Sequence, residues 1–286
     1  MSESASSLSV VRDVDSLRRR LKDWRSANQT IALVPTMGAL HTGHMALVEH
    51  AKALADEVVV SIFVNPTQFG PDEDLAAYPR SDSEDWELLA AADVGLLYMP
   101  DASVMYPEHF QTDVKVIKVS QGLCGDHRPG HFDGVATVVT KLLLQALPDY
   151  AVFGEKDYQQ LVVIKRLVAD LDIPVDIVGL PTVRELDGLA LSSRNAYLSE
   201  PERAIAPALY KELSAVASDI SNGAESSERC AQAAEALLKA GFNTVEYVDA
   251  RDAETLMPLT SHGKPARVLA AVTLGKARLI DNVPVL

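Results

Sequence analysis

The sequence predicts an α/β fold, with one domain built on a parallel sheet and a smaller α+β lobe after it. Two observations lead to this prediction. Apolar runs typical of buried strands alternate with helical stretches as far as Pro181, and beyond it two helices precede three short strands. Strand–helix–strand units imply parallel pairing, whereas segregated helices and strands are typical of α+β lobes. We therefore predict one domain over residues 1–182 and a second over residues 183–286.

The elements of the first domain follow from hydrophobic periodicity. Continuous apolar runs predict buried strands at residues 31–35, 58–64, 94–99, 150–153 and 175–178. Apolar residues at helical spacing predict helices at residues 14–24, 43–55, 81–92, 133–147 and 159–171. Ser81 and Glu84 form the pattern of a capping box at the start of one of these helices.

The second domain begins with another capping-box pattern, formed by Ser199 and Glu202, with Pro201 in the first turn. Apolar residues on one face predict a single long helix through Ile205, Leu209, Leu213, Val216 and Ile220. A second helix is predicted at residues 227–240, and strands at residues 244–248, 267–272 and 277–280.

Length and composition predict a globular protein that binds neither membranes nor nucleic acid. Of the 286 residues, 48% are hydrophobic and 23% charged, as is ordinary for such proteins. There is no run of about 18 apolar residues and no secretory signal pattern in residues 1–9, so we expect a cytoplasmic location. A formal net charge of −14 repels phosphate backbones. Cys124 and Cys230 are too few for a disulfide framework, and we expect reduced, partly buried thiols.

The strongest functional signal is the segment PTMGALHTGH at residues 35–44, where a predicted strand ends and a helix begins. Ligands of α/β folds bind at this edge of the sheet, and a helix N-terminus favours phosphate. Gly38 and Gly43 allow the backbone to approach a ligand closely. His41 and His44 can face a triphosphate together and, as donors or imidazolium ions, stabilise charge that develops on it.

Two other interpretations of this segment stay open. Two histidines at this spacing can form part of a metal site, although no third ligand stands nearby and the glutamate of an H-E-x-x-H motif is absent. They can also be ordinary core or surface histidines. The whole ten-residue segment is more specific than the histidine pair alone.

Two segments offer side chains that suit phosphate. In GEKDYQQ, residues 154–160, Lys156 can reach a phosphate and Gln160 offers a donor and an acceptor. Ser192, Ser193 and Arg194 stand in a polar loop near the start of the second lobe, where they are suited to closing over phosphates. The alternatives are a solvated helix-capping turn for the first segment and an ordinary linker for the second.

Two further segments add polar groups. Asn65 and Gln68 lie in NPTQF after a predicted strand, so their amides belong to the same edge of the sheet. Arg128 belongs to a basic, turn-rich loop at residues 125–132, before a predicted helix. Each signal is weak alone, and their shared placement at strand ends is what gives them weight.

Six motifs in order resemble the pantoate–β-alanine ligase (pantothenate synthetase) family. They are MGALHTGH at residues 37–44, NPTQF at 65–69, YPR at 78–80, RPGHF at 128–132, GEKD at 154–157 and SSRN at 192–195. The resemblance covers residues 33–198 and is only general in the C-terminal lobe. Leu191 stands where the family often has methionine, a volume-conserving change that we expect to be tolerated.

The resemblance implies a Rossmann-like nucleotidyltransferase domain, a C-terminal lid domain and a homodimer. The implied enzyme is a carbon–nitrogen ligase of pantothenate and coenzyme A biosynthesis. ATP and (R)-pantoate give pantoyl-adenylate and pyrophosphate, and β-alanine then attacks the mixed anhydride to give pantothenate and AMP. Mg²⁺ is required. Adenylylation is chemically sensible because a carboxylate is a poor electrophile, whereas its anhydride with AMP has a good leaving group.

The resemblance also assigns roles to matching positions. The residues expected to bind ATP are Met37, Gly38, Ala39, Leu40, His41, Thr42, Gly43, His44, Gly154, Glu155, Lys156, Asp157, Val183, Leu191, Ser192, Ser193 and Arg194. The expected catalytic residues are His44, His41, Lys156, Arg194, Ser192 and Ser193, with His44 as proton donor. Pantoate and β-alanine are expected at Gln68, Gln160, Asn65 and Arg128. Glu84 and Asp85 are the candidate metal ligands.

Three other functions are compatible with parts of the sequence. Another nucleotidyltransferase, which moves AMP or CMP to a phosphate ester, shares the histidine motif and differs in its acceptor. A nucleotide-binding regulator on the same fold needs affinity but not the full charge-stabilising set of His41, His44, Lys156 and Arg194. A tRNA-charging enzyme is disfavoured by the acidic surface and by the lack of room for an anticodon-binding domain.

Overall fold

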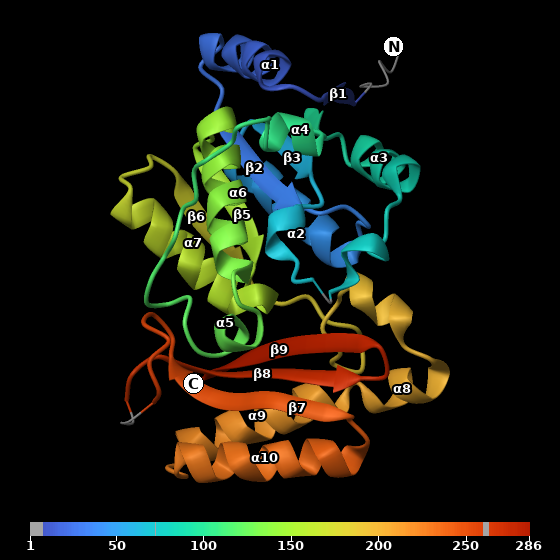
Figure 1. Ribbon diagram of the computed structural model, residues 1–286, viewed down its shortest axis with the longest axis vertical. Helices are drawn as coiled ribbons and strands as arrows, with labels where there is room; N and C mark the ends of the chain where they lie inside the picture. The colour runs from blue at the N-terminus through green and yellow to red at the C-terminus, as the bar shows by residue number, and fades with distance from the viewer. Residues whose placement is uncertain (1–7, 72, 260–262) are drawn as a thin grey trace. The chain divides into compact units, whose positions relative to one another are not determined.

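The computed structural model describes residues 8–71, 73–259 and 263–286. The chain divides into two compact units (Figure 1). Unit 1 consists of Met1–Val116, Pro129–Gly154 and Val163–Leu180, and unit 2 of Ile117–Arg128, Glu155–Val162 and Pro181–Leu286. Two short segments that precede the predicted boundary at residue 183 therefore group with the C-terminal part of the chain. In the described part of the chain, no helix combines the length and the apolar character that crossing a bilayer requires.

Unit 1 is built on a six-stranded sheet with the order β1-β4-β3-β2-β5-β6, and every neighbouring pair is parallel. The strands are β1 (Ser9–Val11), β2 (Ile31–Thr36), β3 (Glu57–Ile62), β4 (Leu96–Tyr98), β5 (Tyr150–Gly154) and β6 (Asp176–Leu180). The predicted parallel sheet is confirmed. Strand β1, at 3 residues, is too short for a hydrophobic pattern and was not predicted.

Helices connect these strands. They are α1 (Val14–Ser26), α2 (Thr42–Leu54), α3 (Asp82–Ala91), α4 (Ala102–Met105), α6 (His131–Ala146) and α7 (Tyr158–Asp170). Short 3₁₀ turns follow β3 at η1 (Pro66–Gln68), precede α3 at η2 (Asp74–Ala76) and follow β5 at η3 (Glu155–Asp157). The α7 helix begins in unit 2 and continues in unit 1.

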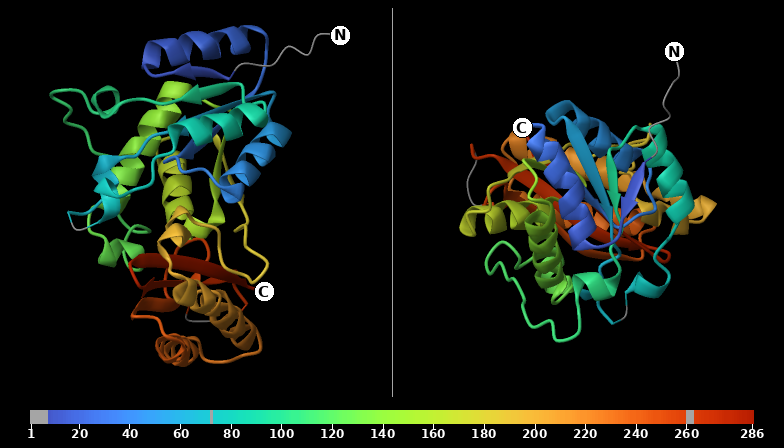
Figure 2. Two further views of the ribbon diagram at one scale, coloured as in Figure 1. Left: turned by 90° about the vertical axis from the view of Figure 1, so that its right-hand side faces the viewer. Right: turned by 90° about the horizontal axis from the view of Figure 1, so that it is seen from above.

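The core of unit 1 reflects the alternation of side chains along its strands. Ala32 and Val34 of β2 pack in one cluster with Leu47, Val48 and Ala51 of α2. Ile31 and Leu33, at the alternate positions of β2, are also fully buried, and the alternation of side chains directs them to the other face. Helices α2 and α6 lie on opposite faces of the sheet (Figure 2). Burial on both faces explains why the strands appear in the sequence as continuous apolar runs.

The strand order changes direction around β2, because the chain builds β3 and β4 on one side of it and then places β5 on the other. Such a switch point leaves a crevice at the carboxyl ends of the two diverging strands, where open α/β sheets bind ligands. The MGALHTGH segment follows β2 at this position.

The start of α3 was predicted correctly, but its predicted capping box is wrong. Ser81 is the N-cap residue and makes no side-chain cap. Its hydroxyl donates instead to Asp85 Oδ1 at 3.0 Å. The Asp85 carboxylate is held by tertiary contacts, and these draw the Ser81 hydroxyl away from the helix end.

Unit 2 contains a three-stranded antiparallel sheet in the order β7-β8-β9. Its elements are α5 (Cys124–His127), η4 (Ser193–Tyr197), α8 (Glu200–Ile205), α9 (Ala208–Ser221), α10 (Ser226–Ala240), β7 (Thr244–Asp252), β8 (Ala266–Leu274) and β9 (Ala277–Val285). Figure 1 shows α9 and α10 on one face of this sheet. Apolar residues of both helices and of the strands form one core that includes Leu213, Leu237 and Val268.

One predicted helix of unit 2 is two helices. The Ser199–Glu202 capping box is present as predicted. The helix then ends at Ile205, and a second one begins at Ala208. Pro207 stands between them, and a proline cannot donate the backbone hydrogen bond that would continue the helix. The apolar face persists across the break because both helices pack on the same core.

Candidate active site

The backbone after β2 turns sharply to begin the MGALHTGH segment. The Thr36 hydroxyl donates to the Ser61 carbonyl at 2.9 Å and accepts the N–H of Gly38 at 3.2 Å. Gly38 has φ +81° and Ala39 has φ +49°. A Cβ at Gly38 would lie 3.0 Å from Asp85 Oδ2 and 3.1 Å from Ile62, so glycine suits both the conformation and the space.

Asp85 of α3 holds this turn. Its side chain is 1% exposed. Oδ2 accepts the N–H of Ala39 at 2.9 Å, and Oδ1 accepts the N–H of Leu40 at 2.7 Å as well as the Ser81 hydroxyl. Hydrogen bonds to an ionised acceptor are among the stronger ones in proteins. Asp85 thus fixes the unusual backbone that leads to the two histidines.

His41 and His44 close the N-terminus of α2 with their own side chains. His41 is the N-cap residue, and its Nδ1 accepts the N–H of Gly43 at 3.1 Å. His44 Nδ1 accepts the N–H of His41 at 3.3 Å, so the two residues form a reciprocal capping box. Their rings lie with centroids 4.1 Å apart.

These two bonds determine where each neutral ring carries its proton. An Nδ1 atom that accepts a backbone N–H holds no proton, so the proton is on Nε2. Both histidines are therefore neutral Nε2–H donors while the cap is intact. This arrangement favours the donor interpretation of the sequence motif over imidazolium, since protonation of Nδ1 would break the cap.

The amides of the NPTQF segment are buried in unit 1. Asn65 is 1% exposed and Gln68 is 9% exposed. Asn65 Nδ2 donates to Gln68 Oε1 at 3.1 Å, and Gln68 Nε2 lies 2.9 Å from the sulfur of Met37. The structure thereby brings together the segments that follow β2 and β3. His131 Nδ1 also lies 2.8 Å from the Gln68 carbonyl oxygen.

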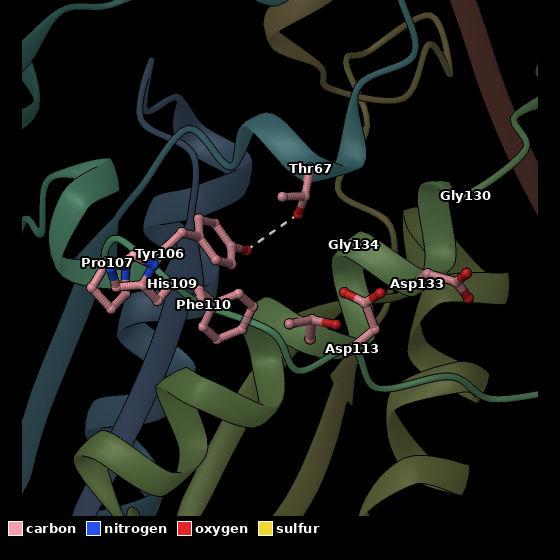
Figure 3. Close-up of a pocket in the computed structure, with 10 residues that line it drawn as sticks. Thr67, Tyr106, Pro107, His109, Phe110, Asp113, Gly130, Asp133 and Gly134 are labelled. Atoms are coloured by element: carbon pink, nitrogen blue, oxygen red, sulfur yellow. Dashed lines mark hydrogen bonds between the residues drawn. The ribbon is translucent and has the colours of Figure 1, made fainter.

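A cavity of about 410 Å³ lies beside this amide pair (Figure 3). Its lining includes Thr67, Tyr106, Asp113, Asp133 and Thr137. Tyr106 Oη donates to Asn65 Oδ1 at 2.7 Å and lies 3.2 Å from the Thr67 hydroxyl. Burial raises the pKa of Tyr106, so the phenol keeps its proton as a donor. Tyr106 therefore connects the wall of the cavity to Asn65.

In unit 2, strand β9 holds the backbone of the GEKD segment. Asn282 Nδ2 donates to the carbonyl oxygens of Glu155 and Lys156, each at 2.9 Å. Arg267 of β8 donates to the Glu155 carboxylate at 2.9 Å, and its guanidinium lies 3.9 Å from the centre of the Tyr158 ring. These contacts fix the turn that carries Lys156.

The same strand anchors the loop that contains Val183 and Leu191. The N–H of Leu191 donates to the Val183 carbonyl at 3.0 Å, so these two predicted nucleotide-binding residues lie side by side. Arg184 makes a bidentate pair with the buried Asp281 at 2.6 and 2.8 Å. Burial raises the pKa of Asp281, while the hydrogen bonds from Arg184 act in the opposite direction. The Ser192 hydroxyl caps η4 by accepting the N–H of Arg194 at 3.3 Å.

The two adjacent glutamines of α7 differ in environment. Gln159 is 4% exposed, and its Oε1 accepts the N–H of Cys124 at 3.0 Å while its Nε2 donates to the Val119 carbonyl at 3.2 Å. Gln160, which the resemblance assigns to pantoate, is partly exposed. Gln159 thus organises the segment that leads to Arg128, a predicted substrate residue that is also partly exposed.

The candidate metal ligands do not form a prepared metal site. Glu84 is exposed, and both oxygens of the buried Asp85 already accept hydrogen bonds. The described residues contain no group of three or more His, Cys, Asp or Glu side chains suited to one ion. The three donors on Asp85 take up most of the roughly four lone-pair sites of its carboxylate, so it is poorly suited to bind Mg²⁺ directly.

Sequence patterns did not identify several residues that shape this site. Among them, Tyr106 and Asn282 act through hydrogen bonds to segments far away in the chain. Their signal in the sequence is a single polar residue in a loop or a strand, without periodicity or a motif. Both cysteines are free thiols, as predicted, and both are buried rather than partly buried.

Comparison with known proteins identifies the chain's relatives. A family model described as pantoate-beta-alanine ligase matches residues 9–284. A curated protein of Paramagnetospirillum magneticum named pantothenate synthetase is 56% identical over 276 residues, 96% of this chain and 97% of its own length. A protein of the same name from Sphingopyxis alaskensis is 52% identical over 278 residues, 97% of this chain and 100% of its own length.

Solved structures of the same family are also similar to this chain. A pantothenate synthetase from Thermus thermophilus is 47% identical, covers 97% of this chain and 99% of its own, and has a TM-score of 0.91. A pantoate-beta-alanine ligase from Francisella tularensis, described as complexed with beta-gamma ATP and beta-alanine, is 34% identical with a TM-score of 0.80, covering 96% of this chain and 97% of its own.

Proposed function

Since the chain belongs to the pantoate–β-alanine ligase family, we propose that it uses the segments described above to join (R)-pantoate to β-alanine through pantoyl-adenylate. The ligase activity, its dependence on ATP and its place in pantothenate biosynthesis are those of the family. The roles of individual residues are our proposal. A homodimer likewise stays a prediction of the resemblance, and a cytoplasmic location stays a prediction from the sequence pattern.

The observation that carries the proposal is the reciprocal cap of His41 and His44 at the switch point of the sheet. We place the ATP phosphates against the Nε2–H groups of these histidines and the segment from Met37. The pantoate carboxylate attacks the α-phosphorus, a new O–P bond forms, and the bond to pyrophosphate breaks. Preorganised donors stabilise the charge that develops in this step because they need no reorganisation. Donation from His44 to the leaving phosphates gives it the proton-donor role.

Lys156 and the polar loop around Arg194 complete the nucleotide site in this proposal. Lys156 places its ammonium group against the phosphates. The hydrogen bond from Asn282 to the Lys156 carbonyl supports this role, because it holds the backbone of the turn. Arg194, Ser192 and Ser193 form a clamp, and Gly154 to Asp157, Val183 and Leu191 flank the nucleoside. The hydrogen bond between Val183 and Leu191 supports their common role. Fixed donors of this kind bind and orient the substrate without themselves being consumed.

Pantoate is held in the proposal by Gln68, Gln160, Asn65 and Arg128. β-Alanine then enters, and its amine attacks the acyl carbon of the adenylate. The C–N bond forms, the bond to AMP breaks, and the amine loses a proton. The buried position of Asn65 and Gln68 supports the protection of the adenylate from water.

Mg²⁺ is expected to arrive with ATP. This ion keeps several waters and is commonly bound by substrate phosphates with few protein ligands. Glu84 stays the candidate for a contact to the ion through one of these waters. Asp85 is the weaker candidate, since its oxygens hold Ala39, Leu40 and Ser81. When bound, the ion would neutralise part of the negative charge of the phosphates.

The experiment that tests the proposal is ATP–pyrophosphate exchange with Mg²⁺, with and without (R)-pantoate, in the absence of β-alanine. Exchange that needs pantoate, followed by AMP and pantothenate formation when β-alanine is added, is the expected result. Exchange that is absent in folded protein that binds ATP, or turnover only with a phosphate-ester acceptor, would contradict it.

His44→Ala is the matching variant. Loss of one preorganised donor is expected to slow exchange by roughly 100- to 1,000-fold, about 3 kcal/mol. His50→Ala, on the same helix but outside the cap, is the control and is expected to stay near the wild-type rate. If His44→Ala exchanges within about twofold of wild type, the proposed role of His44 is wrong.

A further inference from the structure

The buried amide of Asn65 has only one possible orientation. A backbone carbonyl can only accept and a backbone N–H can only donate. The Gly134 carbonyl oxygen lies 3.2 Å from one end of the Asn65 amide, so that end is Nδ2. The N–H of Thr67 lies 3.3 Å from the other end, so that end is Oδ1. Two groups of fixed polarity therefore determine how this side chain is oriented.

Two hydroxyls strengthen this orientation. Thr67 Oγ1 donates to Asn65 Oδ1 at 2.9 Å, and Tyr106 Oη donates to the same oxygen at 2.7 Å. Tyr106 lies on the wall of the cavity, where its hydroxyl is also 3.2 Å from the Thr67 hydroxyl (Figure 3). Turning the amide over would place an NH₂ group against the N–H of Thr67 and an oxygen against the Gly134 carbonyl. Both contacts would be repulsive in a buried position.

The orientation of Asn65 in turn sets that of Gln68. Asn65 Nδ2 faces the Gln68 amide at 3.1 Å, so the Gln68 atom it meets is Oε1. The other end of the Gln68 amide is Nε2, which lies 2.9 Å from the sulfur of Met37. A thioether is a weak acceptor. An oxygen of a substrate can take its place with a gain in hydrogen-bond strength.

We propose that Gly134, Thr67 and Tyr106 act through Asn65 to fix Gln68 as a hydrogen-bond donor toward the oxygen atoms of pantoate. The inference rests on the proposed function, which supplies pantoate as the occupant. Tyr106 is on this account a positioning residue of the acid-binding site, linked to it by two hydrogen bonds in series. Discrimination follows, because a donor of fixed polarity favours a hydroxyl or carboxylate oxygen and disfavours an amino group in its place.

The first test is the pH profile of Gln68→Glu in pantoate-dependent ATP–pyrophosphate exchange. An ionised glutamate cannot donate, whereas a protonated one can accept from Asn65 through one oxygen and donate to pantoate through the other. The rate of the variant relative to wild type is expected to rise as the pH falls, by up to about tenfold per pH unit above the pKa of the glutamate. Gln68→Ala does not titrate at this position and is expected to give a flat ratio.

The outcomes separate the inference from the proposed function. Pantoate-dependent exchange in wild type with a Gln68→Glu ratio that is flat, or that rises with pH, would overturn the donor polarity alone. No pantoate-dependent exchange in wild type would overturn the proposed function, and the inference with it, since the donor would then have no pantoate to meet.

The second test is Tyr106→Phe, which keeps the ring and removes the hydroxyl. We expect kcat/KM for pantoate to fall by about tenfold, the effect of one buried hydrogen bond, with KM for ATP unchanged. Tyr98→Phe is the matched control, because Tyr98 Oη also donates to a buried amide oxygen, that of Gln145 at 3.0 Å. It is expected to leave kcat/KM for pantoate unchanged.

A double variant shows whether Tyr106 acts through Gln68. In the Gln68→Ala background, Tyr106→Phe is expected to cause no further loss, because the group that it positions is gone. An equal loss in both backgrounds, or an equal loss in Tyr98→Phe, would mean that the phenol has only a general structural role.

Discussion

The side-chain nitrogen of Asn282 lies 2.9 Å from the carbonyl oxygen of Lys156, although 126 positions separate the two residues in sequence. Asn282 is 3% exposed and stands on the last strand. Its neighbour Asp281 pairs with Arg184, next to Val183. Two consecutive residues of β9 thus hold two of the segments expected to bind ATP.

Asn282→Ala is expected to loosen the turn that carries Lys156. Two carbonyl groups lose their donor, and leaving such groups unsatisfied costs about 1–3 kcal/mol. We expect a lower free energy of unfolding and a several-fold higher KM for ATP, measured by urea unfolding and initial rates. Asn222→Ala is the control, because Asn222 makes a comparable bond to the Ser218 carbonyl at an exposed helix end. A KM for ATP unchanged from wild type would show that β9 does not position this turn for catalysis.

Asp85→Asn separates a role in the turn from a role as metal ligand. The amide keeps the size of the side chain but replaces one acceptor by a donor, so Ala39 or Leu40 loses its partner. We expect exchange to fall by at least about tenfold, corresponding to one lost charge-assisted bond. Because the defect lies in the backbone, added Mg²⁺ is not expected to restore activity.

The measurement is the exchange rate as a function of Mg²⁺ concentration. Glu87→Gln, an exposed change on the same helix, serves as control. Recovery of Asp85→Asn at high Mg²⁺ would favour the metal-ligand interpretation.

Gly134→Ala is expected to disturb the hydrogen-bonded amides of Asn65 and Gln68, because Gly134 contacts both Asn65 and the backbone of Thr67. A Cβ at Gly134 would overlap the carbonyl oxygen of Thr67, a backbone atom that cannot move alone. Overpacking of this kind costs about 1–3 kcal/mol. Thermal unfolding should show the loss, and pantoate-dependent exchange should fall with it.

Gly70→Ala provides a comparison for this variant. An added Cβ at Gly70 would meet Glu73 at an ordinary contact distance of 3.6 Å. A Gly134→Ala protein as stable and active as Gly70→Ala would contradict the predicted overlap.

The stability of unit 2 is expected to depend on pH through Cys230. Burial raises the pKa of this thiol from 9.0 to about 11. Below pH 9 the thiol is protonated in both the folded and the unfolded chain, so its contribution is fully present. As the pH rises toward 11, the unfolded chain loses the proton first and is stabilised, so the free energy of unfolding falls.

Urea unfolding of wild type and Cys230→Ala at pH 8, 10 and 11 measures this contribution. The stability of wild type relative to the variant is expected to decrease over that interval. A constant difference would show that the thiol titrates alike in both states.

The sequence indicated the fold well because the fold depends on local patterns. Continuous apolar runs predict buried parallel strands, and the predicted strands at 31–35 and 58–64 correspond to β2 and β3. The Ser199–Glu202 box also acts within one turn and is present. Where a local pattern met a competing contact, the prediction was wrong, as at Ser81, whose hydroxyl bonds Asp85 instead of capping α3. Pro207 was visible in the sequence, yet the regular apolar spacing around it hid the break between α8 and α9.

The sequence by itself determined the order of the elements, the parallel sheet, the family resemblance and the segments that carry the chemistry. Those features depend on residue type and spacing within short stretches of chain. Only the tertiary structure decided the orientation of Asn65 and the role of Asp85 in holding the turn after β2. Each of these depends on which donor or acceptor a side chain meets. That partner is a backbone group or a distant residue whose position is fixed only when the chain folds.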